Sequence, residues 1–186
     1  MREWVPVSTS PRGRLALAAV EAFGTRPFAE VTVADLASAA QVTTGALYHH
    51  FGSKLGLYAV ARQDVERRLL DRMEGALAAS ASASRPSPGA TADRSAAVTS
   101  ALLVGLDFAV GGNFLHILGD PPAGTEHDGL AELLGQNVGP AAPLLGRVLA
   151  AAWRAALVAI AEGAEPEHAR AAIAALRIHF PDDDDA

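Results

Sequence analysis

The sequence predicts an all-α protein with a small amino-terminal head and a larger carboxy-terminal helical domain. Half of the 186 residues are apolar, but only 5% are aromatic. Apolar residues recur at helical spacing, and no stretch shows convincing strand alternation. The alanine-rich sequence favours closely packed helices, whereas a β-sandwich would need alternating valine, isoleucine, threonine and tyrosine. We place the head in residues 1–54 and the second domain in residues 55–186.

Four helices are expected before residue 80. Ser10, Thr32 and Ser53 can cap the first, second and fourth of them, because a hydroxyl accepts a hydrogen bond from a free amide of the first turn. Pro11 suits the first turn of its helix, and Gly52 ends the third. The predicted ranges are 11–23, 33–40, 44–51 and 54–79.

Two loops are expected in the rest of the chain. Ser80–Asp93 is rich in serine, proline and glycine, and Gly119–Gly129 contains two adjacent prolines. Around these loops the apolar spacing predicts further helices. Their ranges are 91–110, 112–118, 128–138, 140–162 and 166–179.

Composition and charge exclude several classes of protein. The absence of cysteine excludes disulfides, thiolate metal sites and a cysteine nucleophile. Residues 1–14 lack a signal-like apolar stretch and polar residues interrupt the longest apolar runs, so we expect a cytoplasmic protein without a membrane partner. Residues 1–72 carry nine basic and seven acidic side chains, against six and fourteen in the remainder. The head is therefore mildly basic although the net charge is −6.

Residues 33–51 predict a helix-turn-helix unit packed on the first helix. A helix that enters a DNA major groove, about 12 Å wide, must be short and must carry polar or aromatic groups on its outward face. Val42, Leu47 and Phe51 can pack inward, and Gly45 allows close approach of the backbone. The residues left to face outward are Thr43, Thr44, Tyr48 and His49. Their hydroxyl and imidazole groups suit phosphate hydrogen bonds and contacts to base edges.

This segment resembles the DNA-binding domain of the TetR (tetracycline-repressor) family of bacterial regulators. The resemblance rests on Gly-Ala-Leu-Tyr-His-His-Phe-Gly-Ser-Lys over Gly45–Lys54, on Ala22-Phe23 and on the run Phe28–Val33. It covers about residues 10–60, and beyond them only the helical layout matches. The family implies an all-helical homodimer whose heads bind DNA and whose carboxy-terminal domain binds a small effector.

The resemblance also implies roles for single residues. The recognition helix would contribute Thr43, Thr44, Gly45, Tyr48 and His49. Thr32 would bind a phosphate through its hydroxyl and amide, and Lys54, the only lysine in the chain, would bind one through its charge. On this reading Lys54→Ala weakens binding to all sequences alike and flattens the salt dependence, whereas Tyr48→Ala also disturbs sequence choice.

Other basic groups near this segment allow more than one interpretation. Arg12 and Arg14 are consistent both with an arm that contacts DNA and with a solvated helix start. Four arginines of the fourth helix are expected on the surface or in intramolecular ion pairs. They are Arg62, Arg67, Arg68 and Arg72. The pair His49-His50 is not expected to hold a metal ion, because adjacent side chains of a helix diverge by about 100°.

The predicted helix 140–162 indicates how the protein assembles. Arg147 and Arg154 are placed on one stripe, and most of the remaining circumference is apolar. A helix that is apolar over so much of its surface needs partners on two sides. Together with the helix 166–179 it is expected to form a four-helix interface with a second copy. The alternative is a buried internal hairpin in a monomer.

The resemblance places an effector pocket among the middle helices. The candidate residues are Met73, Leu106, Asp107, Phe108, Asn113, Phe114, His116 and Trp153. Apolar residues dominate this set, so a largely apolar effector is expected, and its polar members have a structural role as the alternative. No metal and no cofactor is expected.

The expected function is a transcriptional repressor that a small molecule releases from a palindromic DNA operator. One alternative is a helical adaptor that binds another protein and no DNA. The other is a small enzyme, but the chain has no Gly-x-Ser-x-Gly elbow, no phosphate-binding glycine loop and no His-Glu-x-x-His sequence.

Overall fold

The structure, a computed structural model, describes residues 10–83, 90–122, 127–138 and 144–176. Within these ranges it contains helices and no strand, which confirms the predicted all-α fold. The first helices are α1 (Pro11–Thr25), the 3₁₀ turn η1 (Phe28–Glu30), α2 (Val33–Ala39), α3 (Thr44–Phe51) and α4 (Lys54–Ala83). They are followed by α5 (Ala90–Gly111), α6 (Leu115–Gly119), α7 (Gly129–Val138), α8 (Leu145–Ala161) and α9 (Pro166–Ala175).

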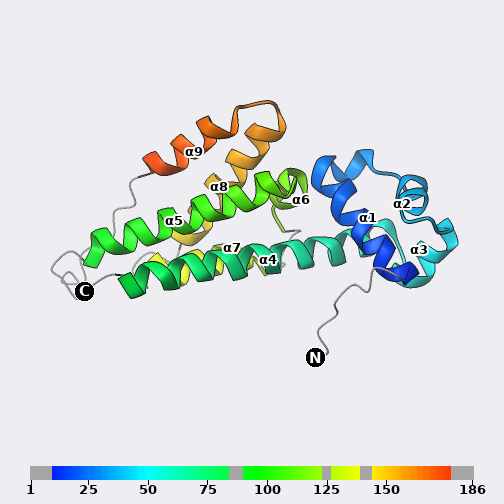
Figure 1. The fold of residues 1–186 in the computed structure, drawn as a ribbon, viewed down its shortest axis with the longest axis horizontal. Coiled ribbons are helices and arrows are strands. Elements are labelled where there is room, and N and C mark those ends of the chain that lie inside the picture. Colours follow the sequence, from blue (N-terminus) through cyan, green and yellow to red (C-terminus); the bar gives the residue numbers. More distant parts are fainter. Residues whose placement is uncertain (1–9, 84–89, 123–126, 139–143, 177–186) are drawn as a thin grey trace.

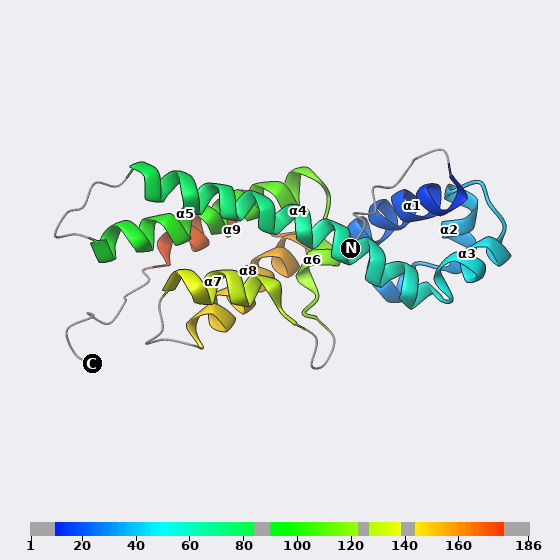
Figure 2. The ribbon, with the colours of Figure 1, turned by 90° about the horizontal axis from the view of Figure 1, so that it is seen from below.

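The molecule is elongated, with a head at one end and a helical body at the other (Figure 1). Helices α1 to α3 form the head, and α4 continues from the head along the whole body (Figures 1 and 2). At 30 residues α4 is about 45 Å long. Helix α5 runs beside α4, α7 packs on α8, and α9 lies against α5. Helix α4 is therefore the one helix, among those described, that belongs to both parts.

Each part has buried apolar side chains in its centre. In the head these come from every helix and include Leu15, Phe23, Leu36, Leu47 and Leu57. In the body they include Met73, Leu102, Leu106, Ile117, Leu130 and Trp153. The indole nitrogen of Trp153 donates a hydrogen bond to the Leu102 carbonyl oxygen over 3.0 Å, so this buried polar atom is satisfied.

The predicted loop Ser80–Asp93 is too long, because α4 continues to Ala83 and α5 begins at Ala90. The hydroxyl of Ser80 donates to the Ala76 carbonyl oxygen over 3.0 Å, and Ser82 bonds Ala78 in the same way over 2.9 Å. These bonds satisfy the hydroxyls inside the helix, and the alternating alanines are strong helix formers. Ser80 and Ser82 therefore do not indicate a loop, because both lie in the last turns of α4.

Three other predicted helix ends shift. The helix expected over 112–118 begins at Leu115, because Asn113 takes a left-handed backbone conformation with φ of 55°. Helix α8 begins at Leu145, and residues 139–143 lie outside the described part of the chain. Helix α9 ends at Ala175, and residues 177–179 of its predicted range are likewise not described.

The two arginines of α8 lie seven residues apart and so on one stripe of the helix, but they differ in exposure. Arg147 is exposed, whereas Arg154 is only 7% exposed. The guanidinium of Arg154 turns inward because the carboxylate of Asp128, just before α7, accepts two hydrogen bonds from it, at 2.7 and 2.8 Å. A buried guanidinium requires such a partner.

One described helical window, Asp93–Gly111, is long and apolar enough to cross a membrane by length and composition alone. It lies in α5, whose residues Val98, Leu102 and Leu106 are buried inside the protein. A helix at the core of a helical domain has the same composition, and α5 packs along α4.

Candidate nucleic-acid interface

Helix α2 begins with a complete capping box. The Thr32 hydroxyl oxygen accepts a hydrogen bond from the Asp35 amide over 3.1 Å, and the Asp35 carboxylate accepts one from the Thr32 amide over 3.0 Å. The bond from the Thr32 amide is the main cause that lowers the pKa of Asp35. The amide of Thr32, which the sequence assigned to a phosphate, is thus engaged within the head, and its exposed hydroxyl retains a proton to donate.

The turn between α2 and α3 is tight and is held from α1. Gln41 has a φ of 54°, and the Val42 amide returns to the Ala37 carbonyl oxygen over 2.9 Å. The Nε of Arg14, on α1, donates to the Ala40 carbonyl oxygen over 2.9 Å. Neither interpretation given for Arg14, an arm that contacts DNA or a solvated helix start, includes this contact inside the head.

Helix α3 presents the outward face that the sequence predicted. Leu47 is fully buried in the head, and Val42 and Phe51 pack against the same core. The exposed residues are Thr43, Thr44, Gly45, Tyr48 and His49. Thr43 also caps the helix, because its hydroxyl oxygen accepts from the Ala46 amide over 3.2 Å. A short helix anchored on one side therefore offers hydroxyl, phenol and imidazole groups on the other.

Lys54 is turned toward the inside of the head. Its ammonium donates to the carbonyl oxygens of Phe28 and Val31, each over 2.8 Å, and lies 4.1 Å from the centre of the Phe28 ring. Two of its three N–H donors are thus used by the backbone that leads into α2. This contact could not be predicted from the sequence, because its acceptors are main-chain carbonyls more than twenty residues away.

The join between α3 and α4 depends on a glycine that sequence reasoning did not single out. A Cβ on Gly56 would collide with the Phe51 carbonyl oxygen, so only glycine allows the two helices to approach this closely. The Ser53 hydroxyl accepts from the Gly56 amide over 2.9 Å and caps α4 as predicted. Together these contacts fix the angle of α3 on α4.

The head meets the body through aromatic and backbone contacts. The rings of Phe23, Phe28 and Tyr58 pack with centroids 5.0 to 5.6 Å apart. Arg62 donates to the Asp120 carbonyl oxygen over 2.7 Å, which ties α4 to the end of α6. Burial raises the pKa of the Tyr58 phenol, which lies beside this bond.

The same junction includes a close approach between main chains. A Cβ on Gly24, near the end of α1, would collide with the carbonyl oxygen of Asn113 in the turn between α5 and α6. The end of α1 therefore lies backbone against backbone with a turn of the body.

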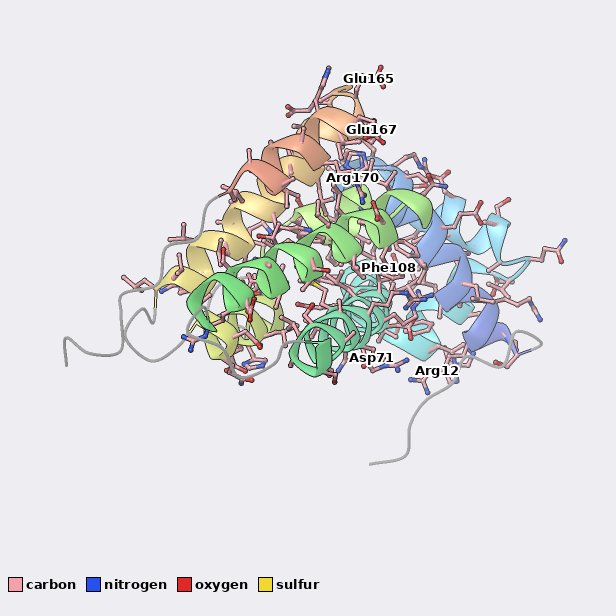
Figure 3. The ribbon with its side chains drawn as sticks, turned by 60° about the vertical axis from the view of Figure 1, so that its left-hand side comes forward. Arg12, Asp71, Phe108, Glu165, Glu167 and Arg170 are labelled. Atoms are coloured by element: carbon pink, nitrogen blue, oxygen red, sulfur yellow. The ribbon has the colours of Figure 1, made fainter. Side chains whose placement is uncertain are left out.

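The predicted effector residues divide into two groups. Met73, Leu106, Phe114 and Trp153 are buried in the body. Phe108 is half-buried, with the Arg72 guanidinium 4.4 Å from its ring centre, and His116 is half-buried on α6. Asp107 and Asn113 are exposed, and Asp107 forms an ion pair with Arg170 of α9, a residue labelled in Figure 3.

A polar cluster in the body was missed by sequence reasoning. The bidentate pair Arg154–Asp128 joins α8 to the start of α7, and Glu66 and Arg62 of α4 lie near it. The Nε of Arg154 is buried without a hydrogen-bond partner among the described residues. Burial opposes ionisation of Asp128, but hydrogen bonds from Arg154 and from the Ala131 amide outweigh it and lower its pKa. The members of this cluster are too far apart in sequence for their spacing to reveal it.

The remaining arginines of α4 behave as expected. Arg67 and Arg68 pair with Asp64 on the same helix, and Arg67 also pairs with Asp71. Among the described residues, no group of three or more metal-ligating side chains is found that could hold a metal ion.

The comparisons with known proteins agree with this geometry. Residues 16–61 match the sequence model of the bacterial regulatory proteins of the tetR family, a range that runs from α1 through α3 into the first turns of α4. No curated protein matches the chain. The matched range contains the whole outward face of α3 and Lys54, the first residue of α4, whereas Arg14 lies two residues before it. The amino-terminal head is therefore similar to the DNA-binding domain of the tetR family of bacterial regulatory proteins.

Proposed function

We propose that the protein is a homodimeric repressor that binds a palindromic operator and is released from it by a small molecule. The observation that carries the DNA-binding part is the outward face of α3, where Thr43, Thr44, Gly45, Tyr48 and His49 are exposed. A short helix with this face fits a major groove about 12 Å wide.

The exposed groups of this face divide by chemistry. The hydroxyls of Thr43 and Thr44, at the amino end of α3, suit phosphate oxygens, and the exposed hydroxyl of Thr32 suits another. Tyr48, whose exposed fraction is 54%, and His49 follow on the next turn and suit base edges. For Lys54 one N–H donor is left for the predicted phosphate contact.

An exposed apolar stripe on α8 supports the dimer. Its members follow one another at intervals of four and three residues, the spacing of helices that pack side by side. They are Leu144, Val148, Ala151, Ala155 and Val158. Helix α9 adds exposed alanines at 171, 172 and 175. The monomeric alternative requires these side chains to be covered within one chain, whereas Val148 is 59% exposed.

The proposed effector acts on the body, and α4 carries the response to the head. The boundary at residue 54 is proposed as a division of function, because α4 begins there and is continuous through the body. The body core is largely apolar and supports a largely apolar effector, with Met73, Leu106 and Trp153 nearest its centre. Binding shifts an equilibrium between DNA-competent and released states by a coupling energy of about 1–3 kcal/mol.

The first test is selection of a binding site from random duplex DNA, followed by affinity measurements with Tyr48→Ala. We expect a two-fold symmetric site whose halves lie about one helical turn, or a multiple of it, apart. Tyr48→Ala should relax sequence preference, because it removes a proposed contact to base edges. The head should stay folded, because the Tyr48 side chain is exposed. A wild-type chain that enriches no sequence, and binds DNA without salt dependence, would favour the adaptor instead.

A further inference from the structure

We propose that operator binding is coupled to protonation of His49 and His50, so that the protein binds its operator more tightly as the pH falls from about 8 to about 6. The inference rests on the proposed function, because it concerns the same outward end of α3. It assigns a role to His50, which lies outside the predicted set of DNA-binding residues, and it makes the affinity for DNA depend on pH.

The segment that carries the recognition helix has no fixed positive charge. Residues 32–53 contain no lysine and no arginine, and their single carboxylate is Asp35. Affinity for DNA comes largely from positive side chains that neutralise phosphates. The groups of this segment that become positive near neutral pH are the two adjacent imidazoles, because histidine takes up its proton between about pH 5 and 8.

Both imidazoles lie at the carboxyl end of α3. His49 is exposed and His50 is half-buried, and their ring centres are 5.0 Å apart. The His50 ring also lies 6.4 Å from the ring of Phe51, which packs against the core of the head. A helix carboxyl end favours a cation, because its last carbonyls carry partial negative charge. The pair therefore lies where a positive charge is favourable, on the helix that is proposed to enter the groove.

The cations that neighbouring helices bring to α3 do not change with pH in this range. From α1, the Arg12 guanidinium lies 5.7 Å from the centre of the Phe51 ring, and Arg14 is bonded to the Ala40 carbonyl oxygen. From α4, Lys54 keeps one N–H donor for the predicted phosphate contact. Arginine and lysine side chains stay charged near neutral pH, so these contacts contribute affinity without making it depend on pH.

The other titratable groups on the helices packed against α3 are also in a fixed state. The carboxylates are Glu21 on α1 and Asp35 on α2, and the bond from the Thr32 amide lowers the pKa of Asp35. Tyr58, in the second turn of α4, has its pKa raised by burial, so its phenol stays neutral. Among the residues that the structure describes, no carboxylate forms an ion pair with His49 or His50. The two imidazoles are therefore the groups of this face whose charge changes near neutral pH.

Protonation changes what the imidazoles offer to DNA. A neutral ring has one N–H donor, whereas an imidazolium has two donors and a positive charge, which suit phosphate oxygens and the acceptor edge of guanine. Negative groups close to an imidazole favour its charged form. The DNA-bound protein then holds more protons than the free protein, so the affinity rises as the pH falls through the histidine range. At lower pH the free protein is protonated too, and the affinity stops rising.

The experiment measures affinity of the full-length protein for the selected operator at about pH 6, 7 and 8 and at constant ionic strength. The variants are H49Q, H50Q and the double variant H49Q/H50Q. The matched control is H168Q, because His168 is an exposed histidine on α9, in the body and away from the head (Figure 1). The salt dependence of binding is measured at the two ends of the pH range.

We expect operator affinity of the wild-type protein to rise about tenfold or more between pH 8 and pH 6, with a salt slope steeper by about one at the lower pH. Each single variant should show a smaller rise and the double variant almost none. The H168Q protein should behave like the wild type. A wild-type affinity that does not change with pH, or a rise that persists in the double variant, would overturn the proposal.

A second measurement needs no variant and covers the case in which loss of His50 unfolds the head. Calorimetric titration of the wild-type protein with operator at pH 7 is repeated in buffers of different ionisation enthalpy, which counts the protons taken up on binding. We expect an uptake of about one proton or more. Binding without proton uptake would contradict the proposal. Failure of the proposed function differs from both results, since the wild-type protein would then prefer no sequence at any of these pH values.

Discussion

Glu66 is a half-buried carboxylate on α4 that faces charged groups from three elements. Arg62 lies on the same helix, Arg154 on α8, and His127 and Asp128 just before α7. Burial is the strongest influence and raises the pKa of Glu66, whereas the two arginines act in the opposite direction without cancelling it. The ionised form of Glu66 is therefore less favourable in the folded protein than in the unfolded chain.

We predict that Glu66→Gln raises the free energy of unfolding at pH 7. A carboxyl group whose folded pKa is raised contributes its stability below the unfolded pKa and loses it as the pH rises through the folded value. The increase in the free energy of unfolding caused by Glu66→Gln should become smaller as the pH falls through the ordinary pKa range of glutamate. Below that range Glu66 is protonated in both the folded and the unfolded state. Urea unfolding of both proteins at pH 7 and near pH 4 measures this. A stabilisation by Glu66→Gln that becomes larger at acid pH would contradict a raised pKa of Glu66.

At the scale of helices, the angle between α3 and α4 depends on Gly56. We predict that Gly56→Ala forces the helices apart, because the added methyl group would meet the Phe51 carbonyl oxygen. Operator affinity should fall at least tenfold, because displaced recognition contacts are worth about 1–3 kcal/mol each. The unfolding transition measured by circular dichroism should also move to lower temperature.

The control for this prediction lies on the same helix. Gly75 of α4 is exposed, and a Cβ there would meet nothing within 4 Å. Gly75→Ala should stabilise the protein by about 0.5–1 kcal/mol and leave operator binding unchanged, because alanine is the better helix former. Equal behaviour of the two variants would mean that helix propensity, and not the α3–α4 approach, decides the result.

The sequence predicted local features of the elements well and long-range contacts poorly. Caps at Ser10, Thr32 and Ser53 follow from the identity of one residue and its neighbours, and the structure contains all three. The inward bonds of Lys54 end on main-chain carbonyls, which every residue possesses, so no residue type marks them. Arg154 and Asp128 are 26 positions apart, and only the packing of α7 on α8 brings them together.

At the scale of the whole molecule, the exposed stripe of α8 determines assembly in the proposed dimer. We predict that Val148→Glu gives a folded monomer, because the side chain is 59% exposed in the single chain but would place a charge inside the interface of two copies. Sedimentation at micromolar concentration measures the oligomeric state. Operator affinity should fall together with dimer content, because one head alone contacts one half-site.

Leu17→Glu is the matched control for the assembly prediction. Leu17 is also an exposed apolar residue, at 48%, but it lies on α1 in the head. Its substitution should leave the sedimentation coefficient unchanged. Dissociation by Leu17→Glu, or a dimer that survives Val148→Glu, would place the contact between copies elsewhere.

The meeting of Gly24 with the turn at Asn113 has a mechanical consequence. Where two side chains touch, a change of rotamer can absorb a small shift. The main chains at Gly24 and Asn113 are in direct contact and cannot adjust in this way. We therefore expect a displacement of that turn to move the end of α1 with it and to tilt the head. In the proposed dimer both heads would tilt symmetrically, and a small strain beside the body core would change the distance between the two copies of α3.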